Sequence, residues 1–220
     1  MSESAPRPDP MTEPVSRPAP SAWNLANGLT VSRILLVPVY GLLLLAQGGD
    51  SAAMRWWAAA VFVVATATDR VDGDIARSRG LITNFGKIAD PIADKALMGM
   101  AFVGLSVLGE LPWWVTVVVL VREWGITVMR FVVIRHGVMP AGRGGKVKTA
   151  LQSLGLTLFT LPLTTFPAAH TWQVVADVVL GLAVLVTVVT GLDIALKAHR
   201  LRQTSERAQM KRAARAARRR

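Results

Sequence analysis

Six long hydrophobic runs, separated by short polar segments, dominate the chain. They cover residues 29–47, 54–70, 90–108, 111–134, 149–166 and 173–196. Each run approaches the roughly 20 apolar residues that a helix needs to cross a bilayer. Turn-forming sequences separate neighbouring runs, among them GGDSAA at 48–53, GELP at 109–112 and TFPAAHT at 165–171. The pattern predicts an all-α, polytopic membrane protein with six transmembrane helices.

The composition agrees with this prediction. Hydrophobic residues make up 52% of the 220 residues, and the mean hydropathy is +0.41. Many of the seven tryptophans lie near the ends of the apolar runs, as in the aromatic belts of membrane proteins. The chain contains no cysteine, which excludes disulfides and thiolate chemistry.

Both ends of the chain differ from the hydrophobic region. Residues 1–20 contain six prolines and no apolar run, which predicts a disordered cytosolic N-terminus. Residues 197–220 contain ten of the 25 lysines and arginines and are expected to form a basic cytosolic tail. We expect residues 21–196 between these ends to form the six-helix domain.

The distribution of basic residues predicts the orientation. If both termini and residues 70–89 and 135–148 share one side of the membrane, the opposite side receives only Arg55. By the positive-inside rule, the termini and the segment around residues 70–89 then face the cytoplasm. Because the net charge of +11 is concentrated beside the last apolar run, anionic headgroups explain it better than nucleic acid does.

Four aspartates are gathered in a 26-residue segment with hydrophobic chain on either side: Asp69, Asp72, Asp90 and Asp94. The first two are three residues apart and the last two are four apart, so on helices each pair shares a face. A bend around Gly80 would bring the two faces together. Four carboxylates in one cleft repel one another unless cations lie between them, and such hard ligands select Mg²⁺, Mn²⁺ or Ca²⁺. The alternative is that these acids are solvated loop residues.

The aspartates belong to a longer motif, D-x2-D-G-x2-A-R-x8-G-x3-D-x3-D. Its members are Asp69, Asp72, Gly73, Ala76, Arg77, Gly86, Asp90 and Asp94. The two glycines lack side chains, so a nucleotide can approach the backbone, and Arg77 can bind a diphosphate with its forked guanidinium. At every specified position the motif resembles the signature of the CDP-alcohol phosphotransferase family. The resemblance implies a membrane enzyme that catalyses phosphoryl transfer with two Mg²⁺ or Mn²⁺ ions.

The resemblance also implies roles for individual residues. The four aspartates, Asp69, Asp72, Asp90 and Asp94, would bind the two ions, and Asp94 would also be the general base. The CDP moiety would be bound by Asn27, Thr30, Asp72, Gly73, Ala76, Arg77, Thr83 and Gly86. Arg33, on the same hydrophobic run as Asn27 and Thr30, could close the nucleotide site or anchor the chain at the interface.

Four basic residues in the second half of the chain are candidates for binding an anionic acceptor: Arg122, Arg130, Lys146 and Lys148. Arginines within membrane spans are costly and generally point into polar cavities. The glycines of GRGGKVKTALQ predict a loop before the fifth span, close to a ligand. The alternatives are an ion pair between Arg122 and Glu123, snorkelling by Arg130, and lysines that only set the orientation. Neighbouring helix residues do not face each other, which argues against that ion pair.

Three stretches sharpen the resemblance: NLANGLTVSRILLVPVY, DPIADKALM and REWGITVMR followed by GKVKT. Within the family they are most similar to the bacterial phosphatidylglycerophosphate synthases, although Ala26 stands where these commonly have proline. This implies CDP-diacylglycerol and sn-glycerol 3-phosphate as substrates in phospholipid biosynthesis. It also implies a homodimer in the bacterial cell membrane, in contact with anionic headgroups.

Other functions remain as alternatives. A cardiolipin synthase of the same family would use phosphatidylglycerol as acceptor, and a phosphatidylinositol phosphate synthase fits REWGITVMR poorly. A divalent-cation transporter would need its carboxylates near the bilayer midplane, and a membrane scaffold would act through its basic tail. Isolated acids (Asp177, Asp193) and scattered histidines (His136, His170, His199) show no metal-ligand spacing, so no zinc site is expected.

Overall fold

Six long α-helices make up the protein in the computed structural model, which describes residues 25–79, 84–133 and 143–204. They are α1 (Leu25–Leu45), α2 (Ala52–Arg79), α3 (Asn84–Val107), α4 (Trp113–Val133), α5 (Arg143–Thr160) and α6 (Ala169–Thr204), with short 3₁₀ helices η1 (Ala46–Gly49) and η3 (Leu163–Thr165). The predicted all-α fold and its six helices are therefore confirmed.

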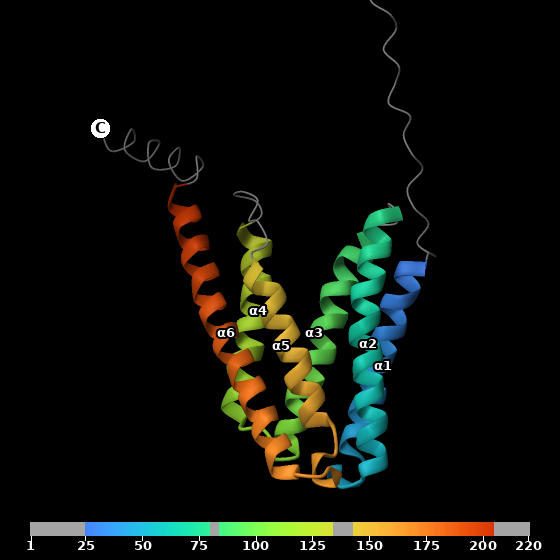
Figure 1. Ribbon diagram of the computed structural model, residues 1–220. Helices are drawn as coiled ribbons and strands as arrows, with labels where there is room; N and C mark the ends of the chain where they lie inside the picture. Colours follow the sequence, from blue (N-terminus) through green and yellow to red (C-terminus); the bar gives the residue numbers. More distant parts are fainter. Residues whose placement is uncertain (1–24, 80–83, 134–142, 205–220) are drawn as a thin grey trace, which may run out of the picture.

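The helices form two groups that meet at one end and diverge toward the other (Figure 1). One group contains α1, α2 and α3, and the other contains α4, α5 and α6. We call the end that carries η1, η3 and the α3–α4 turn the closed end. The opposite end, where α1, α3 and α5 begin, is the open end. Contacts of α3 with α4 and α5 join the two groups.

The outer surface of the bundle is apolar, as a membrane protein requires. Residues 27–49 and 169–196 form helical segments that are long and apolar enough to cross a bilayer. Large hydrophobic side chains that are more than half exposed lie on several helices: Leu35, Leu42, Trp57, Val64, Val121, Val128, Leu185 and Leu192. Such an extensive apolar exterior suits contact with lipid rather than with water.

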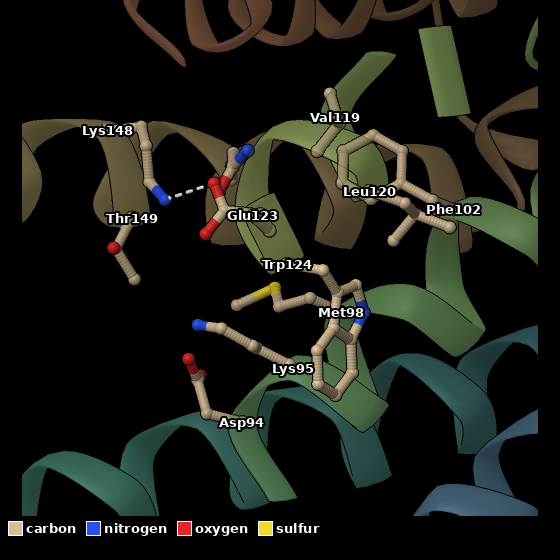
Figure 2. Close-up of a pocket in the computed structure, with 11 residues that line it drawn as sticks. Asp94, Lys95, Met98, Phe102, Val119, Leu120, Glu123, Trp124, Lys148 and Thr149 are labelled. Atoms are coloured by element: carbon tan, nitrogen blue, oxygen red, sulfur yellow. Dashed lines mark hydrogen bonds and ion pairs between the residues drawn. The ribbon is translucent and has the colours of Figure 1, made fainter. Parts of the chain in front are cut away.

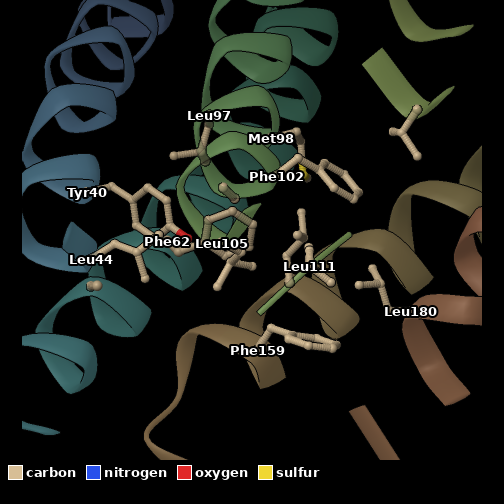
Figure 3. Close-up of a cluster of buried hydrophobic side chains, with 14 of the residues drawn as sticks. Tyr40, Leu44, Phe62, Leu97, Met98, Phe102, Leu105, Leu111, Phe159 and Leu180 are labelled. Atoms are coloured by element: carbon tan, nitrogen blue, oxygen red, sulfur yellow. The ribbon is translucent and has the colours of Figure 1, made fainter. Parts of the chain in front are cut away.

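The hydrophobic core fills the space between the two groups near the closed end (Figure 3). Its members include Tyr40, Leu44, Phe62, Leu97, Phe102, Leu105, Leu111, Phe159 and Leu180. Glycines let the helices approach closely: a Cβ atom on Gly155 would lie 3.1 Å from the Cα of Leu180. Small residues at helix interfaces serve the same purpose in membrane bundles generally.

An ion pair ties three segments together at the closed end. The Arg55 guanidinium of α2 forms a bidentate pair with Glu110 in the α3–α4 turn, and it also donates to the backbone carbonyls of Phe159 and Thr160 in α5. The hydroxyl of Thr160 in turn lies 2.9 Å from the buried hydroxyl of Tyr40 in α1. The sequence predicted Arg55 only as an isolated charge.

Some helix boundaries differ from the predicted ones. α2 continues to Arg79, so the motif residues between Asp69 and Arg79 lie on a helix. The predicted loop before the fifth span is wrong, because α5 already begins at Arg143. Glycines cost little in a first turn, where the backbone N–H groups have no intrahelical acceptor. α6 continues to Thr204 because no glycine or proline follows Gly191 in this helix.

Candidate active site

A pocket lies between the two helix groups, near the middle of α3 and α4 and the first turns of α5. Its cavity volume is about 20 Å³, within about 400 Å³ of empty space that includes open solvent. Its lining residues are Asp94, Lys95, Met98, Phe102, Val119, Leu120, Glu123, Trp124, Lys148, Thr149 and Gln152. Charged side chains from α3, α4 and α5 surround one side of it, and apolar side chains form the other (Figure 2).

Two predicted site residues from different helices meet in the structure. The hydroxyl of Thr30 in α1 donates a hydrogen bond to Oδ1 of Asp90 in α3. Thr30 belongs to a polar face of α1 that also contains Asn27 and Arg33, and the three side chains are at most 6% exposed. Their spacing of three residues places them along one side of the helix. Such burial excludes the alternative role of Arg33 as an exposed interfacial anchor.

The aspartate motif lies on α2 and α3, which are in contact. Asp90 is exposed, whereas Asp94 is half-buried and lines the pocket. Pro91 has no backbone N–H and so removes one hydrogen bond from this part of α3. Within the described part of the chain, no three histidine, aspartate or glutamate side chains form a group that could hold a metal ion.

The rest of the motif lies partly outside the described residues. Thr83 is outside them altogether. Five further motif residues lie on α2, but the structure describes only their backbone: Asp69, Asp72, Gly73, Ala76 and Arg77. The same holds for Gly86 at the start of α3. The meeting of the two aspartate pairs therefore stays a prediction.

Two of the basic residues predicted to bind the acceptor, Arg122 and Lys148, form a hydrogen-bond network around Glu123 of α4. Its Oε1 atom accepts hydrogen bonds from Nη1 of Arg122 at 2.7 Å and from Nζ of Lys148 at 2.6 Å. The other end of the Arg122 guanidinium donates to the hydroxyl of Thr190 in α6 at 2.8 Å. A Cβ atom on Gly191 would lie 3.0 Å from the Arg122 side chain, so this glycine gives the arginine room.

The argument against an Arg122–Glu123 ion pair is thus wrong. Although neighbouring residues leave a helix in different directions, both side chains are long enough to curve toward a shared partner. Lys148, across on α5, holds the glutamate from the other side. All three side chains are at most 17% exposed. At such burial, a charge needs an opposite charge and hydrogen bonds beside it.

The structure separates the four predicted acceptor-binding residues. Lys148 lines the same pocket as Asp94, whereas Arg122 lies behind Glu123 and does not line it. The side chains of Arg130 and Lys146 are outside the described residues. Sequence reasoning missed Lys95, which also lines the pocket. The available signal was its position directly after Asp94 in the motif.

The acids and histidines outside the motif lie apart from this pocket. Asp177 is exposed on α6 and accepts a long hydrogen bond of 3.3 Å from Gln173, one turn earlier. Asp193 and His170 are exposed on the same helix. His136 and the side chain of His199 fall outside the described residues.

Comparison with known proteins identifies the family. A family model described as CDP-alcohol phosphatidyltransferase matches residues 23–189. The chain belongs to this family. The matched region contains the complete aspartate motif and every pocket residue, so the CDP-alcohol phosphatidyltransferase fold accounts for the site as well as for the helices.

Relatives within the CDP-alcohol phosphatidyltransferase family include a probable phosphatidylglycerophosphate synthase from Mycobacterium tuberculosis. It is 50% identical over 186 residues, which cover 83% of this chain and 87% of the relative. A CDP-diacylglycerol–glycerol-3-phosphate 3-phosphatidyltransferase from Bacillus subtilis is 37% identical over 186 residues, or 78% of this chain and 93% of the relative. A CMP-forming cardiolipin synthase from Streptomyces coelicolor is 30% identical over 159 residues, or 72% and 73%.

Membership in the CDP-alcohol phosphatidyltransferase family makes the chain a membrane-bound transferase. The family generally uses divalent metal ions. The family match over residues 23–189 identifies an enzyme and excludes the alternatives of a cation transporter and a membrane scaffold. Two carboxylates and two lysine ammonium groups in one pocket suit an acid–base reaction on an anionic substrate.

Proposed function

We propose that this chain transfers the phosphatidyl group from CDP-diacylglycerol to sn-glycerol 3-phosphate and releases CMP. The product is phosphatidylglycerophosphate, an intermediate of phospholipid biosynthesis. The observation that carries the proposal is the 50% identity to the M. tuberculosis relative over 83% of this chain, a region that includes the motif and the pocket. The B. subtilis relative, named for the same reaction, supports it at 37% identity.

The aspartates suit a pair of divalent cations. We propose that Asp69, Asp72, Asp90 and Asp94 hold two ions, either Mg²⁺ or Mn²⁺. The donor set consists of carboxylate oxygens, the ligands that such hard cations prefer. When bound, the ions neutralise the diphosphate and the departing CMP. The hydrogen bond from Thr30 leaves a second oxygen of the exposed Asp90 carboxylate for a ligand.

In the proposed reaction, Asp94 accepts the proton of the acceptor hydroxyl. The hydroxyl oxygen then bonds to the β-phosphorus of CDP-diacylglycerol, and the bond from that phosphorus to CMP breaks. Asn27, Thr30, Gly73, Ala76, Arg77, Thr83 and Gly86, together with Asp72, bind the CDP moiety. Lys148, with Arg130 and Lys146, binds the phosphate of the acceptor, and Arg122 supports Lys148 through their shared partner Glu123. Paired charges and forked donors of these kinds recognise phosphates well.

We further propose that the open end faces the cytoplasm of a bacterial cell, where a water-soluble acceptor is available. Both termini then lie in the cytoplasm, with residues 1–20 disordered, residues 21–196 as the catalytic domain and residues 197–220 as a basic tail. The tail would contact anionic headgroups. The protein would act as a homodimer.

The decisive measurement is CMP release from CDP-diacylglycerol by the purified protein. Three acceptors should be compared: sn-glycerol 3-phosphate, phosphatidylglycerol and inositol 1-phosphate. We expect release only with glycerol 3-phosphate, loss of activity on chelation by EDTA, and recovery with Mg²⁺ or Mn²⁺. Asp94→Asn should reduce the rate at least about a hundredfold, the lower range for removal of a general base.

Asp177→Asn is the matched control, because this exposed aspartate lies on α6 away from the pocket. It should leave the rate unchanged. Release with glycerol 3-phosphate that persists in Asp94→Asn would contradict the assigned base. Release without any divalent cation would contradict the proposed metal site.

Cardiolipin synthesis is the second candidate, because the S. coelicolor relative of that name is 30% identical over 72% of this chain. The same assay separates the two reactions. CMP release with phosphatidylglycerol instead of glycerol 3-phosphate would leave the family assignment and the proposed metal site unchanged. It would identify phosphatidylglycerol as the acceptor.

A further inference from the structure

Lys95 is the one cation of the pocket that has no partner among the described residues. It lines the pocket from α3, opposite Lys148 from α5. Figure 2 shows its ammonium group reaching into the space between Asp94 and Glu123. Across residues 25–79, 84–133 and 143–204, Lys95 forms no hydrogen bond and no ion pair, whereas Lys148 is bonded to Glu123 at 2.6 Å.

Lys95 lies in the field of Glu123, but among the described residues no anion forms a hydrogen bond or ion pair with it. The Oε1 atom of Glu123 already accepts hydrogen bonds from two cations, Arg122 and Lys148. A half-buried ammonium group loses part of its hydration, and this cost is recovered only when an anion binds beside it. Asp94 is nearby, but in the proposed reaction its carboxylate is engaged by a metal ion and by the acceptor's proton. The pocket is thus prepared for an additional anion.

We propose that Lys95 binds the phosphate group of the acceptor, together with Lys148. This inference rests on the proposed function, since it assumes a phosphorylated acceptor. The phosphate would lie between a lysine of the first helix group and a lysine of the second. Lys95 directly follows Asp94, so the same turn of α3 holds the acceptor's charge and receives its proton. Lys95 thereby selects an acceptor that carries its own phosphate.

The test compares three variants of the full-length enzyme: Lys95→Gln, Lys95→Met and Lys95→Arg. Removing the charge should raise the KM for sn-glycerol 3-phosphate about tenfold to a hundredfold, the effect of one lost hydrogen bond to a charged group. The KM for CDP-diacylglycerol should change less than about twofold. Lys95→Arg should restore most of the affinity, because it keeps a cation at this position.

Thermal unfolding in detergent shows whether each variant folds, and Lys95→Met, which keeps the apolar stem, replaces Lys95→Gln if the latter does not. An unchanged KM for glycerol 3-phosphate in a folded, uncharged variant would overturn the inference. A KM that rises for CDP-diacylglycerol instead would assign Lys95 to the nucleotide and would also overturn it. Failure of the proposed function is distinct, because the wild-type enzyme would then release no CMP with glycerol 3-phosphate.

Discussion

At the scale of single residues, the site combines motif positions with partners that no motif contains. The spacing of Asp90 and Asp94 predicts a shared helix face, and both lie on α3 one turn apart. The hydrogen bond from Thr30 to Asp90 joins residues 60 positions apart in the chain. It orients one carboxylate oxygen of Asp90 toward α1. Thr30 therefore acts on the site by holding a proposed metal ligand in place.

Thr30→Val tests this role at nearly constant volume. The valine removes the hydroxyl that donates to Asp90 while filling a side-chain position that is 2% exposed. We expect kcat/KM to fall about tenfold and more metal to be needed for half-maximal activity, as for other lost contacts to a metal ligand. Steady-state CMP release at a series of Mg²⁺ concentrations measures both effects.

Thr30→Ser is the matched control, since it keeps the hydroxyl and should retain most of the activity. An unchanged metal requirement in Thr30→Val would show that the hydrogen bond does not support the metal site.

At the scale of helices, the closed end and the pocket have separate tasks. The core and the Arg55–Glu110 pair join α2, α5 and the α3–α4 turn at the closed end. The pocket charges come from the middle of α3 and α4 and the first turns of α5. The Arg55–Glu110 pair therefore need not take part in chemistry, whereas Met98, Phe102 and Val119 belong to both the core and the pocket lining. Stability and substrate binding should respond to different substitutions.

Arg55→Gln is expected to destabilise the fold and leave the substrates' KM values unchanged. The substitution removes the bidentate partner of Glu110 and donors to the carbonyls of Phe159 and Thr160. We expect a loss of about 2 kcal/mol, the typical value for hydrogen bonds to a charged group. Unfolding in detergent measures stability, and CMP release at temperatures where the variant stays folded measures KM. A raised KM with unchanged stability would contradict this division.

At the scale of the whole molecule, the even number of helices places the first and last helix ends on the same side of the membrane. Six antiparallel helices place the start of α1 and the end of α6 at the open end (Figure 1). The positive-inside rule then predicts that this end faces the cytoplasm. The single arginine at the opposite end, Arg55, is already neutralised by Glu110. Its pairing removes a charge that would otherwise weaken this orientation.

Single cysteines can test the orientation, because the natural chain has none. Asp50→Cys places an exposed thiol at the closed end, and Gly145→Cys places one at the start of α5, where a Cβ atom meets no neighbour. In intact spheroplasts, a membrane-impermeant maleimide should label only Asp50→Cys. Gly145→Cys should react after permeabilisation, and the cysteine-free protein should not react at all. The reverse labelling pattern would overturn the cytoplasmic position of the open end.

The sequence by itself determined the number of helices, the membrane location and the aspartate motif. These features depend on local properties, namely the length of hydrophobic runs and the spacing of residues along one helix. It also predicted a role for Lys148, as one of four basic residues that could together bind the phosphate of an anionic acceptor. It could not predict how long the helices continue beyond the apolar runs, since polar residues extend α2 and α6 as readily as they end them.

Only the tertiary structure decided which charges meet. Lys148 contacts Glu123 across 25 residues of chain, Arg122 reaches Thr190 across 68, and Arg55 reaches Glu110 across 55. Such contacts depend on how helices pack and rotate against one another, which side-chain spacing along a single helix does not specify. The same packing places Lys95 in the pocket without a described partner. A residue that looks like an ordinary motif neighbour thereby becomes a candidate for binding the acceptor.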